Sequence, residues 1–293
     1  MCYNDGERKI RTDMRGNGML LQVIKQWRFC QTGLQGTFMK KRFSLMLLLG
    51  LAGGASAASH LDQVQAQGVL KVCTTGDYKP YTSLRADGDY EGIDIAMAQS
   101  LANSLGVKVE WVKTSWKTLM PDFQSGQCDI GMGGISVTLE RQKKAFFSST
   151  LDVDGKIPLV RCDDKDQYQT VAQINQPSVR VIEPAGGTNE AFVHAHLPNA
   201  RLALHDNVTI FQQLVDKQAD VMITDASEAL YQQKRYPQLC AVNPSSPMQY
   251  GEKAYMLPRD DLSWKLYVDQ WLHLSKSTGE YRRIMSEWLG KVE

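Results

Sequence analysis

Two acidic side chains stand three residues apart, directly after a short apolar run. Asp225 and Glu228 follow residues 221–223, whose partly β-branched composition predicts a buried strand, and an amphipathic helix is predicted from Ala226 onward. At this spacing, both carboxylates share one face of the first helical turn. Because ligands of open α/β sheets bind at the carboxyl ends of the strands, the pair is expected beside a ligand.

The pair has two interpretations. In the first, Asp225 is the N-cap and Glu228 the third helical residue of a capping box, which satisfies free backbone N–H groups and implies no function. In the second, one carboxylate stays ionised and raises the pKa of its neighbour, which a cleft desolvates, so that a protonated general acid results. The positive end of the helix dipole opposes the second interpretation, which therefore requires burial or a nearby anionic ligand.

A second group of polar residues follows a predicted strand at 128–132. The loop begins with two glycines, at 133 and 134, which allow a ligand to approach the backbone, and Ser136 and Thr138 add hydroxyl groups. Arg141 follows within one helical turn and is a candidate for bidentate binding of a carboxylate. The alternative for Arg141 is a solvated arginine at a helix start.

A third candidate lies at residues 183–190, where a turn opens a helix. The free N–H groups at such a helix start, together with the positive end of the helix dipole, suit an anion. The polar and aromatic loop at 74–81 follows the first predicted strand and is a further place for ligand contacts.

The predicted elements that carry these loops alternate between strand and helix. Strands are predicted at 69–73, 107–112, 128–132, 179–182, 200–204 and 220–224, and helices at 60–67, 96–105, from Thr114, at 168–174, 208–215, from Ala226, from Leu262 and from Gly279. We expect an α/β fold of two lobes, each interrupted in sequence. The first lobe is predicted at 58–156 and 251–293, and the second at 157–250.

The residues before this region resemble an export signal. Residues 39–57 have a basic start, an apolar middle and a small-residue exit, so we expect a signal peptide cleaved after Ala57, with residues 1–38 as an extension upstream of the true start at Met39. Residues 1–57 hold nine of the 33 Lys and Arg and three of the 32 Asp and Glu, so the remainder has a net charge of about −5. This charge argues against a nucleic-acid partner. A composition of 43% hydrophobic and 22% charged residues indicates a soluble globular protein with no membrane span after the signal.

Four of the six cysteines lie after the signal, in a compartment that permits disulfides. Cys162 and Cys240 flank the predicted second lobe, and a bridge between them would close its two ends. For Cys73 and Cys128, a bridge and two buried free thiols stay open as alternatives. No Cys-x-x-Cys motif or histidine cluster indicates a metal site.

Several motifs carry a resemblance to the periplasmic amino-acid-binding proteins. They are Gly-Asp-Tyr-Lys-Pro-Tyr at 76–81, Gly-Ile-Ser-Val-Thr-Leu-Glu-Arg at 134–141, Gly-Gly-Thr-Asn-Glu at 186–190 and Thr-Asp at 224–225. The resemblance covers nearly all of the chain after the signal. It implies the type II periplasmic-binding-protein fold, in which a ligand cleft lies between two lobes.

Further motifs resemble one family within that superfamily, the cyclohexadienyl dehydratases. They lie at 114–116, 206–213, 224–229 and 267–273. The resemblance implies a periplasmic enzyme of phenylalanine biosynthesis that converts prephenate to phenylpyruvate and arogenate to phenylalanine. It also implies that no metal or organic cofactor takes part, and that the partner is the small-molecule substrate.

The resemblance assigns a role to each candidate residue. Glu228 would be the general acid, and the expected substrate contacts are Asp77, Tyr78, Trp116, Gly134, Ser136, Thr138, Arg141, Gly187, Thr188, Asn189 and Asp225. Arg141 would hold a substrate carboxylate, while Trp116 and Tyr78 would wall the ring. Glu190 ranks second as the acid. One departure is the order Pro184-Ala185 before the glycine pair, where the family has Asn-Pro, which puts the geometry of this loop in question.

The main alternative is a non-catalytic amino-acid-binding protein that serves an ABC transporter. Glu228 discriminates, because a binding protein needs Asp225 for a ligand ammonium and needs no second carboxylate. A ligand-sensing domain is a third alternative, but the sequence lacks the signalling segments that it requires. The preference between prephenate and arogenate and the oligomeric state, with a homo-oligomer as one alternative, stay open.

Overall fold

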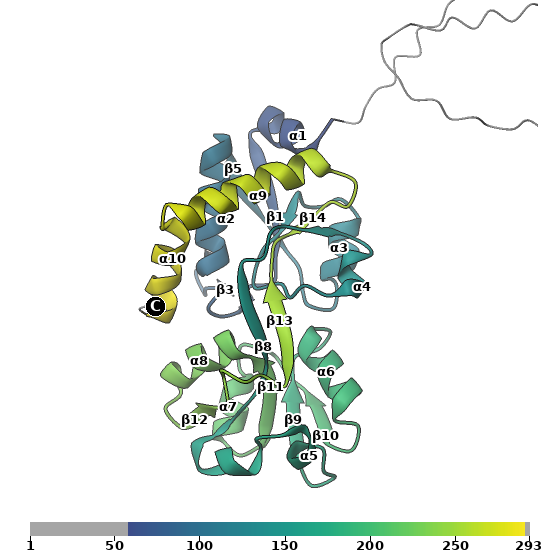
Figure 1. Cartoon of the computed structure of the whole chain (residues 1–293), viewed down its shortest axis with the longest axis vertical. Coiled ribbons are helices and arrows are strands. Elements are labelled where there is room, and N and C mark those ends of the chain that lie inside the picture. Colours follow the sequence, from purple (N-terminus) through teal and green to yellow (C-terminus); the bar gives the residue numbers. More distant parts are fainter. Residues whose placement is uncertain (1–57, 291–293) are drawn as a thin grey trace, which may run out of the picture. The chain divides into compact units, whose positions relative to one another are not determined.

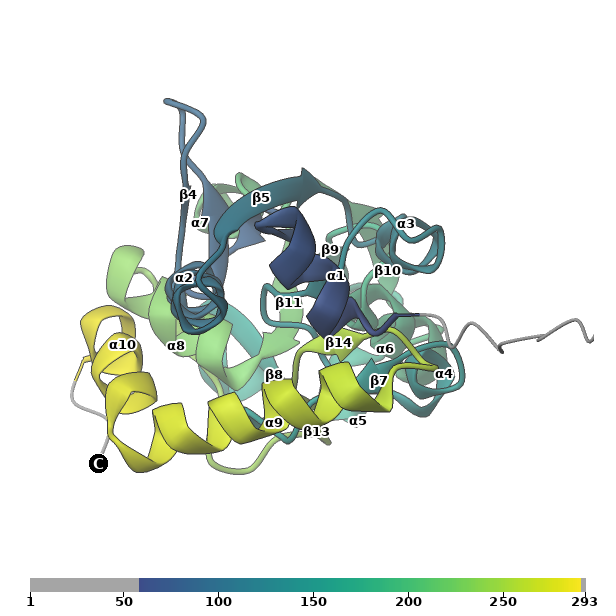
Figure 2. The same ribbon diagram turned by 90° about the horizontal axis from the view of Figure 1, so that it is seen from above.

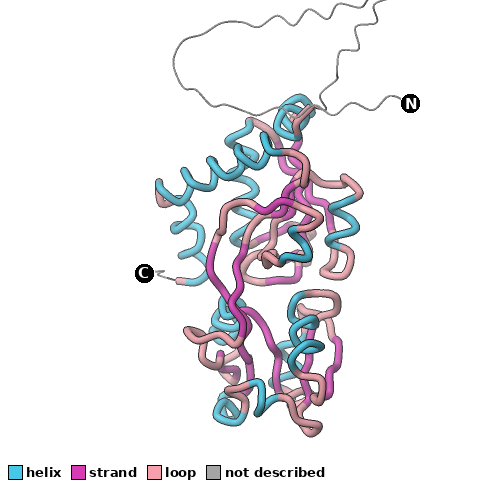
Figure 3. The backbone as a smooth tube through the Cα atoms, turned by 45° about the vertical axis from the view of Figure 1, so that its right-hand side comes forward, coloured by secondary structure: helices cyan, strands magenta, loops and turns pink. Residues whose placement is uncertain are grey.

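The computed structural model describes residues 58–290, which belong to one compact unit spanning Ala55–Glu293. The predicted upstream extension at 1–38 and the predicted signal peptide at 39–57 lie outside the described residues. Within residues 58–290, none of the helices has the length and apolar character needed to cross a membrane. Two regions, each with helices around a sheet, are joined by a pair of extended strands (Figures 1 and 3).

The first lobe is built on a five-stranded sheet in the order β5-β1-β6-β14-β7. β1 pairs in parallel with β5 and β6, whereas β14 runs antiparallel to β6 and β7. The strands are β1 (Val69–Thr74), β5 (Lys108–Lys113), β6 (Ile130–Gly131), β14 (Met256–Leu257) and β7 (Phe146–Phe147). A small antiparallel sheet is formed by β2 (Asp77–Tyr78), β3 (Thr82–Leu84) and β4 (Tyr90–Glu91).

Helices from both ends of the described chain complete the first lobe. They are α1 (His60–Gln67), α2 (Ile93–Leu105), α3 (Leu119–Gln124), α4 (Leu139–Gln142), α9 (Leu262–Ser277) and α10 (Glu280–Leu289). Figure 2 shows α9 running along one side of this lobe, and its residue Trp264 is fully buried in the same core as Leu70 of β1 and Leu101 of α2. The Trp264 indole N–H donates to the backbone oxygen of Asp129 at 2.9 Å, so the buried ring keeps its hydrogen bond.

The second lobe has a sheet in the order β10-β9-β11-β8-β12. β9 pairs in parallel with β10 and β11, and β8 runs antiparallel to β11 and β12. All residues of β11 are buried, as expected of a central strand covered on both faces. The elements are β8 (Asp152–Arg161), a 3-10 helix (Cys162–Gln167), α5 (Val171–Ile174), β9 (Arg180–Glu183), α6 (Thr188–His196), β10 (Arg201–Leu204), α7 (Ile210–Val215), β11 (Val221–Asp225), α8 (Ala226–Arg235) and β12 (Leu239–Ala241).

Two paired strands connect the lobes. β13 (Gln249–Lys253) runs antiparallel to β8, with Lys253 opposite Asp152 and Gln249 opposite Lys156 (Figure 1). The lobe boundaries that we expect after residues 156 and 250 fall inside these two strands, and the division at those residues stays a prediction. Each of these two strands carries one lysine of the site described below, Lys156 on β8 and Lys253 on β13.

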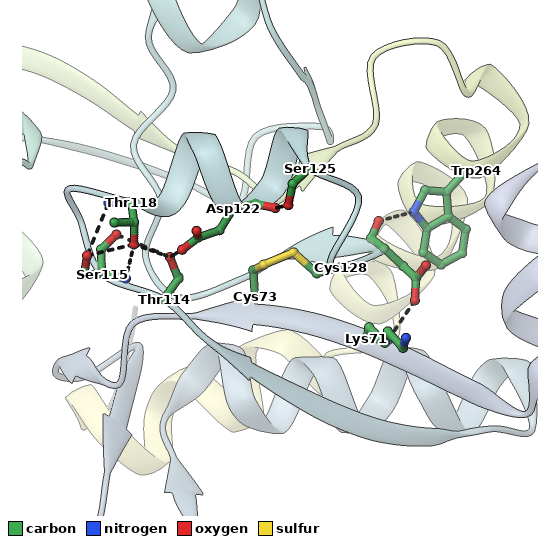
Figure 4. Close-up of a disulfide and its surroundings, with 10 residues drawn as sticks. Lys71, Cys73, Thr114, Ser115, Thr118, Asp122, Ser125, Cys128 and Trp264 are labelled. Carbon is green, nitrogen blue, oxygen red and sulfur yellow. Dashed lines mark hydrogen bonds between the residues drawn. A yellow bond between two sulfur atoms is a disulfide. The ribbon is translucent and has the colours of Figure 1, made fainter.

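Two predicted helices begin three or more residues later in the structure than predicted. The helix predicted from Thr114 begins only at Leu119, because hydroxyl groups close the preceding turn: Ser115 Oγ lies 2.9 Å from Thr118 Oγ1 (Figure 4). Thr114 Oγ1 also donates to the Asp122 carboxylate at 2.5 Å. The helix predicted at 168–174 is limited to α5, where Thr170 and Gln173 form a capping box.

The structure contains two disulfides. Cys162 pairs with Cys240 in the second lobe, and Cys73 pairs with Cys128 in the first lobe, where the bridge links β1 to the residues before β6 (Figure 4). The alternative of two buried free thiols at Cys73 and Cys128 is therefore wrong for this structure. Each bridge holds together segments that are distant in sequence.

The Cys162–Cys240 bridge should stabilise the second lobe, because it spans 78 residues and restricts the unfolded chain. The double variant Cys162→Ser with Cys240→Ser should lose about 2–4 kcal/mol of unfolding free energy. Urea unfolding monitored by circular dichroism measures this loss. An unchanged unfolding midpoint would show that the bridge contributes nothing to stability.

Candidate active site

Asp225 lies where β11 ends and α8 begins, and its carboxylate turns away from the helix. It makes no hydrogen bond to the backbone N–H groups of α8. Instead, Oδ1 pairs with Lys156 Nζ at 2.8 Å, while Oδ2 pairs with Lys253 Nζ and accepts from the Tyr78 hydroxyl at 2.6 Å. The capping-box interpretation of the acidic pair is therefore wrong.

Another strand supplies the missing helix cap. The Asp154 carboxylate on β8 accepts from the Ser227 N–H at 3.2 Å and from the Ser227 hydroxyl at 2.5 Å. An acidic group at the positive end of α8 is favourable whichever segment provides it. Because Asp154 takes this role, Asp225 and Glu228 are both available for other contacts.

The two members of the acidic pair have opposite electrostatic environments. Burial alone would raise the pKa of Asp225, but Lys156 and Lys253 hold the pKa of that carboxyl well below its usual range. Asp225 is thus an anion at neutral pH.

Glu228, by contrast, is held in its protonated form. Its side chain is 0% exposed, and this burial, with the Asp225 and Asp77 carboxylates, raises its pKa to about 8. The Thr224 hydroxyl donates to Oε2 at 2.5 Å and acts in the opposite direction. Oε1 is buried and has no hydrogen-bond partner among the described residues, so the acidic hydrogen is available there for another acceptor.

Sequence reasoning missed the two lysines. Lys156 donates to the Thr188 hydroxyl at 2.9 Å and to the Asn189 side-chain oxygen, and Lys253 donates to the Ser136 hydroxyl at 3.0 Å. Both lie on the connecting strands, where the available signal was a lysine directly before an apolar run, residues 157–160 for Lys156 and 254–257 for Lys253. That signal does not reveal that two strands bring both lysines to one carboxylate.

The glycine loop after β6 is held by a third residue that sequence reasoning missed. Asp94, at the start of α2, accepts from the Gly133 N–H at 2.9 Å and from the Gly134 N–H at 2.6 Å. Burial raises the pKa of Asp94 to about 6, against the opposing effect of these two hydrogen bonds. Gly134 has φ +70°, and a Cβ atom there would lie 2.6 Å from the Tyr78 ring, so a larger residue would displace the ring.

Arg141 and Thr138 lie at the margin of the site. The Arg141 guanidinium donates to the Ser136 backbone oxygen at 2.8 Å, and Thr138 caps α4 by accepting from the Arg141 N–H at 3.1 Å. Burial lowers the pKa of Arg141 to about 10, which leaves it charged at neutral pH. Its predicted contact with a substrate carboxylate stays a prediction.

Aromatic rings form one wall of the site. Tyr78 and Trp116 meet edge to face with ring centroids 5.3 Å apart, and Tyr81 stacks on Tyr78 at 5.8 Å. Trp116 belongs to the turn before α3, which hydrogen bonds between Ser115 and Thr118 close.

The start of α6 forms the opposite wall. Asn189 donates to the Thr224 hydroxyl at 3.3 Å and so connects Lys156 to the residue that contacts Glu228. The Glu190 carboxylate accepts from the Gly186 N–H at 2.5 Å, which gives it a structural role in this turn.

A narrow cavity lies between these walls. Its lining includes most of the predicted contacts and two residues that were not predicted, and it consists of Tyr78, Trp116, Gly134, Ser136, Pro184, Gly187, Thr188, Asn189, Asp225 and Lys253. Four predicted residues lie elsewhere: Glu228 is buried behind the lining, Arg141 is under the glycine loop, Thr138 lines a neighbouring cavity and Asp77 lines a larger hollow with Asn207. Asn207 Nδ2 donates to the Asp77 backbone oxygen at 2.8 Å and thus joins the two lobes.

No group of three or more His, Cys, Asp or Glu within the described part of the chain has the arrangement needed to hold a metal ion. The polar groups of the site are instead an anionic carboxylate, a protonated carboxyl, ammonium groups and hydroxyls. Such a set can bind an anion and donate a proton to it.

Comparison with known proteins identifies the family of the chain. The model of "Bacterial extracellular solute-binding proteins, family 3" matches residues 70–291. A cyclohexadienyl dehydratase of Pseudomonas aeruginosa is 50% identical over 245 residues, which cover 83% of this chain and 91% of that protein.

Two solved structures are also similar to this chain in sequence and fold. The ancestral amino acid-binding protein AncCDT-1, described as a precursor of cyclohexadienyl dehydratase, is 33% identical with a TM-score of 0.73, and the match covers 79% of this chain and 100% of that one. An ancestral cyclohexadienyl dehydratase is 50% identical with a TM-score of 0.51, covering 80% of this chain and 97% of that one. The chain belongs to family 3 of the bacterial extracellular solute-binding proteins, and it shares half of its aligned residues with a cyclohexadienyl dehydratase.

Proposed function

We propose that the protein is a carbon–oxygen lyase that converts prephenate to phenylpyruvate and arogenate to phenylalanine, with Glu228 as the general acid. The observation that carries the proposal is a buried carboxyl with a pKa raised to about 8, one oxygen of which has no partner among the described residues. An amino acid-binding protein has no need of a protonated Glu228. The 50% identity to a cyclohexadienyl dehydratase supports the same choice of reaction.

The reaction needs one proton and no oxidant. Glu228 donates its proton to the ring hydroxyl, the C–O bond breaks, and the hydroxyl leaves as water. The bond from the ring to its carboxylate then supplies its electron pair to the ring, which becomes aromatic as carbon dioxide leaves. Glu228 remains as a carboxylate and is reprotonated from solvent before the next turnover.

The charges around the cavity fit an acidic substrate. Lys156 and Lys253 pair with the Asp225 carboxylate, and Arg141 lies near enough to interact with its charge, so three cationic side chains lie around this carboxylate. Prephenate carries two carboxylates, and arogenate carries two carboxylates and one ammonium. Binding either anion beside Glu228 would further favour its protonated form.

The surrounding residues have positioning roles in this proposal. Trp116 and Tyr78 face the ring, while Thr188 and Asn189, fixed by Lys156, offer polar contacts at the start of α6. Orientation and exclusion of water in the closed cleft would supply the part of the rate that a single acid does not.

We also propose that the protein works in the periplasm after removal of a signal peptide at residues 39–57. The description of its family as extracellular supports an exported protein. The two disulfides among the described residues fit an oxidising compartment.

Replacing the acid should abolish the reaction. With prephenate at neutral pH, the purified protein should form phenylpyruvate, and Glu228→Gln should lower kcat by about 10²-fold or more, because a positioned acid contributes this much. Absorbance of phenylpyruvate measures the rate. Glu190→Gln is the matched control, since Glu190 caps a turn, and it should retain most of the activity. No turnover by the parent protein would refute the proposed reaction, and equal losses in both variants would refute the assignment of Glu228.

The pH dependence should report the same carboxyl. Only the protonated acid can donate a proton. The value of kcat should therefore be constant below a pH of about 8 and decrease above it. The Thr224 hydroxyl stabilises the carboxylate form, so Thr224→Val should raise the pKa of Glu228 and move the alkaline limb to higher pH.

Thr224→Ser keeps the hydroxyl and should keep the limb of the parent protein. The comparison requires only kcat measured from pH 6 to 10 for the three proteins. An alkaline limb that stays in place in Thr224→Val would show that another group controls the rate.

A further inference from the structure

The hollow that Asp77 lines lies on the other side of β2 from the substrate cavity. Side chains alternate along a strand, and of the two residues of β2, Tyr78 lines the cavity whereas Asp77 lines the hollow. The hollow also reaches the helix that carries the proposed acid. Gln232 lines it and lies about one helical turn after Glu228, so the two side chains share one face of α8.

The hollow contains buried oxygen atoms without a partner. Asp77 Oδ1 and Asn207 Oδ1 are both buried, and neither has a hydrogen-bond partner among the described residues. The side-chain amide of Asn207 donates to the Asp77 backbone oxygen at 2.8 Å, so the two residues meet where the lobes meet. The hollow extends from these buried atoms to the exposed residues Arg85 and Asp87.

Asp77 differs from the other acidic residues that line the hollow. Glu91 pairs with Lys79 at 2.8 Å, and Asp87 pairs with Arg85. Asp77 has no such ion pair within the described part of the chain, and burial raises its pKa, with a further contribution from the Asp206 carboxylate. The charged groups that line the hollow with Asp77 are Lys79, Arg85, Asp87, Glu91 and Arg235.

The proposed reaction consumes one proton in each turnover. Glu228 gives this proton to the departing hydroxyl and must regain one from solvent, but its side chain is 0% exposed. Closure of the cleft around a substrate excludes water from the cavity side. A carboxyl group can accept and release a proton, and Asp77 lies near enough for its charge to raise the pKa of Glu228.

We propose that this hollow is the proton entrance of the active site, and that Asp77 relays protons from solvent to the Glu228 carboxylate. The inference rests on the proposed function. Asp77 takes up a proton at the hollow and passes it to Glu228, which returns Asp77 to its carboxylate form, so no other reactant is needed. Asp77 thus acts through Glu228 and not on the substrate. A separate entrance lets the acid regain its proton without opening the substrate cavity to water.

The first turnover separates proton donation from proton return. At pH 6, which is below the pKa of about 8 of Glu228, each site begins with its proton in place. Asp77→Asn should therefore form its first equivalent of phenylpyruvate from prephenate at the parent rate and then turn over more slowly. Rapid-quench measurement should give a ratio of first-turnover rate to kcat that is at least about tenfold larger in Asp77→Asn than in the parent protein.

A small acid that enters the hollow should replace the relay. Imidazolium should raise the kcat of Asp77→Asn towards the parent value. It should not raise the kcat of the parent protein or of Glu228→Gln, because the rescued proton must still pass through Glu228. A first turnover as slow as the later ones in Asp77→Asn, without rescue by imidazolium, would indicate a structural role and overturn the proposal.

Asp87→Asn is the matched control. It removes a carboxylate from the exposed rim of the same hollow and leaves Asp77 in place, so its ratio of first-turnover rate to kcat should equal that of the parent protein. An equal increase of this ratio in Asp87→Asn would overturn the assignment of Asp77. If Asp77→Asn does not fold, Asp77→Ser takes its place and must show the same ratio and the same rescue.

The same measurements distinguish failure of the relay from failure of the proposed function. No phenylpyruvate from the parent protein would refute the proposed reaction, and the relay with it. Turnover by the parent protein together with an unchanged ratio in Asp77→Asn would refute the relay alone and leave Glu228 as the proposed acid.

Discussion

The ionised carboxylate of Asp225 is the interaction on which the rest of the site depends. It stands at the end of the central strand of one lobe and is neutralised by a lysine from each of the two strands that join the lobes, Lys156 and Lys253. The Tyr78 hydroxyl of the other lobe completes its contacts. A buried anion without these partners would be strongly unfavourable. Both lysines are placed by the register of β8 against β13, so this register also sets the geometry of the cleft.

This arrangement explains how two carboxyls so close in sequence reach opposite protonation states. Asp225 has two cations and stays ionised, while Glu228 is fully buried, feels the negative charge of its neighbour and has the Thr224 hydroxyl as its hydrogen-bond partner among the described residues. Two titratable groups whose environments separate their pKa values are the usual basis for assigning acid and base roles. The helix dipole, which would favour the Glu228 anion, is satisfied separately by Asp154. Neither Asp225 nor Glu228 is therefore needed to cap the helix.

The parts of the fold that follow local rules were predictable from the sequence. The strand before Asp225, the helix after it and the two C-terminal helices lie where periodicity and turn residues indicate. The family motifs likewise pointed to most of the residues that line the cavity. The capping box was one interpretation of the acidic pair because the local spacing fits it. It is wrong because Asp154, on a separate strand, caps the helix instead. The sequence did not predict the roles of Lys156, Lys253 and Asp94. Each contacts a loop or carboxylate that is distant in sequence, and local sequence patterns do not indicate such contacts.

The same fold can serve binding or catalysis, so the difference must lie in a few side chains. In a cleft built to hold a solute, an aspartate at the end of a central strand is a natural acceptor for a ligand ammonium. Here that acceptor is already occupied by lysines of the protein, and a protonated carboxyl lies one helical turn further on, with a free oxygen. The two lysine ammonium groups beside Asp225 suit an anionic ligand, and an anion in the cleft would in turn favour the protonated form of Glu228. In the proposed reaction, anion binding and proton donation are therefore coupled through Asp225, because the lysines that pair with it would also attract an anionic substrate.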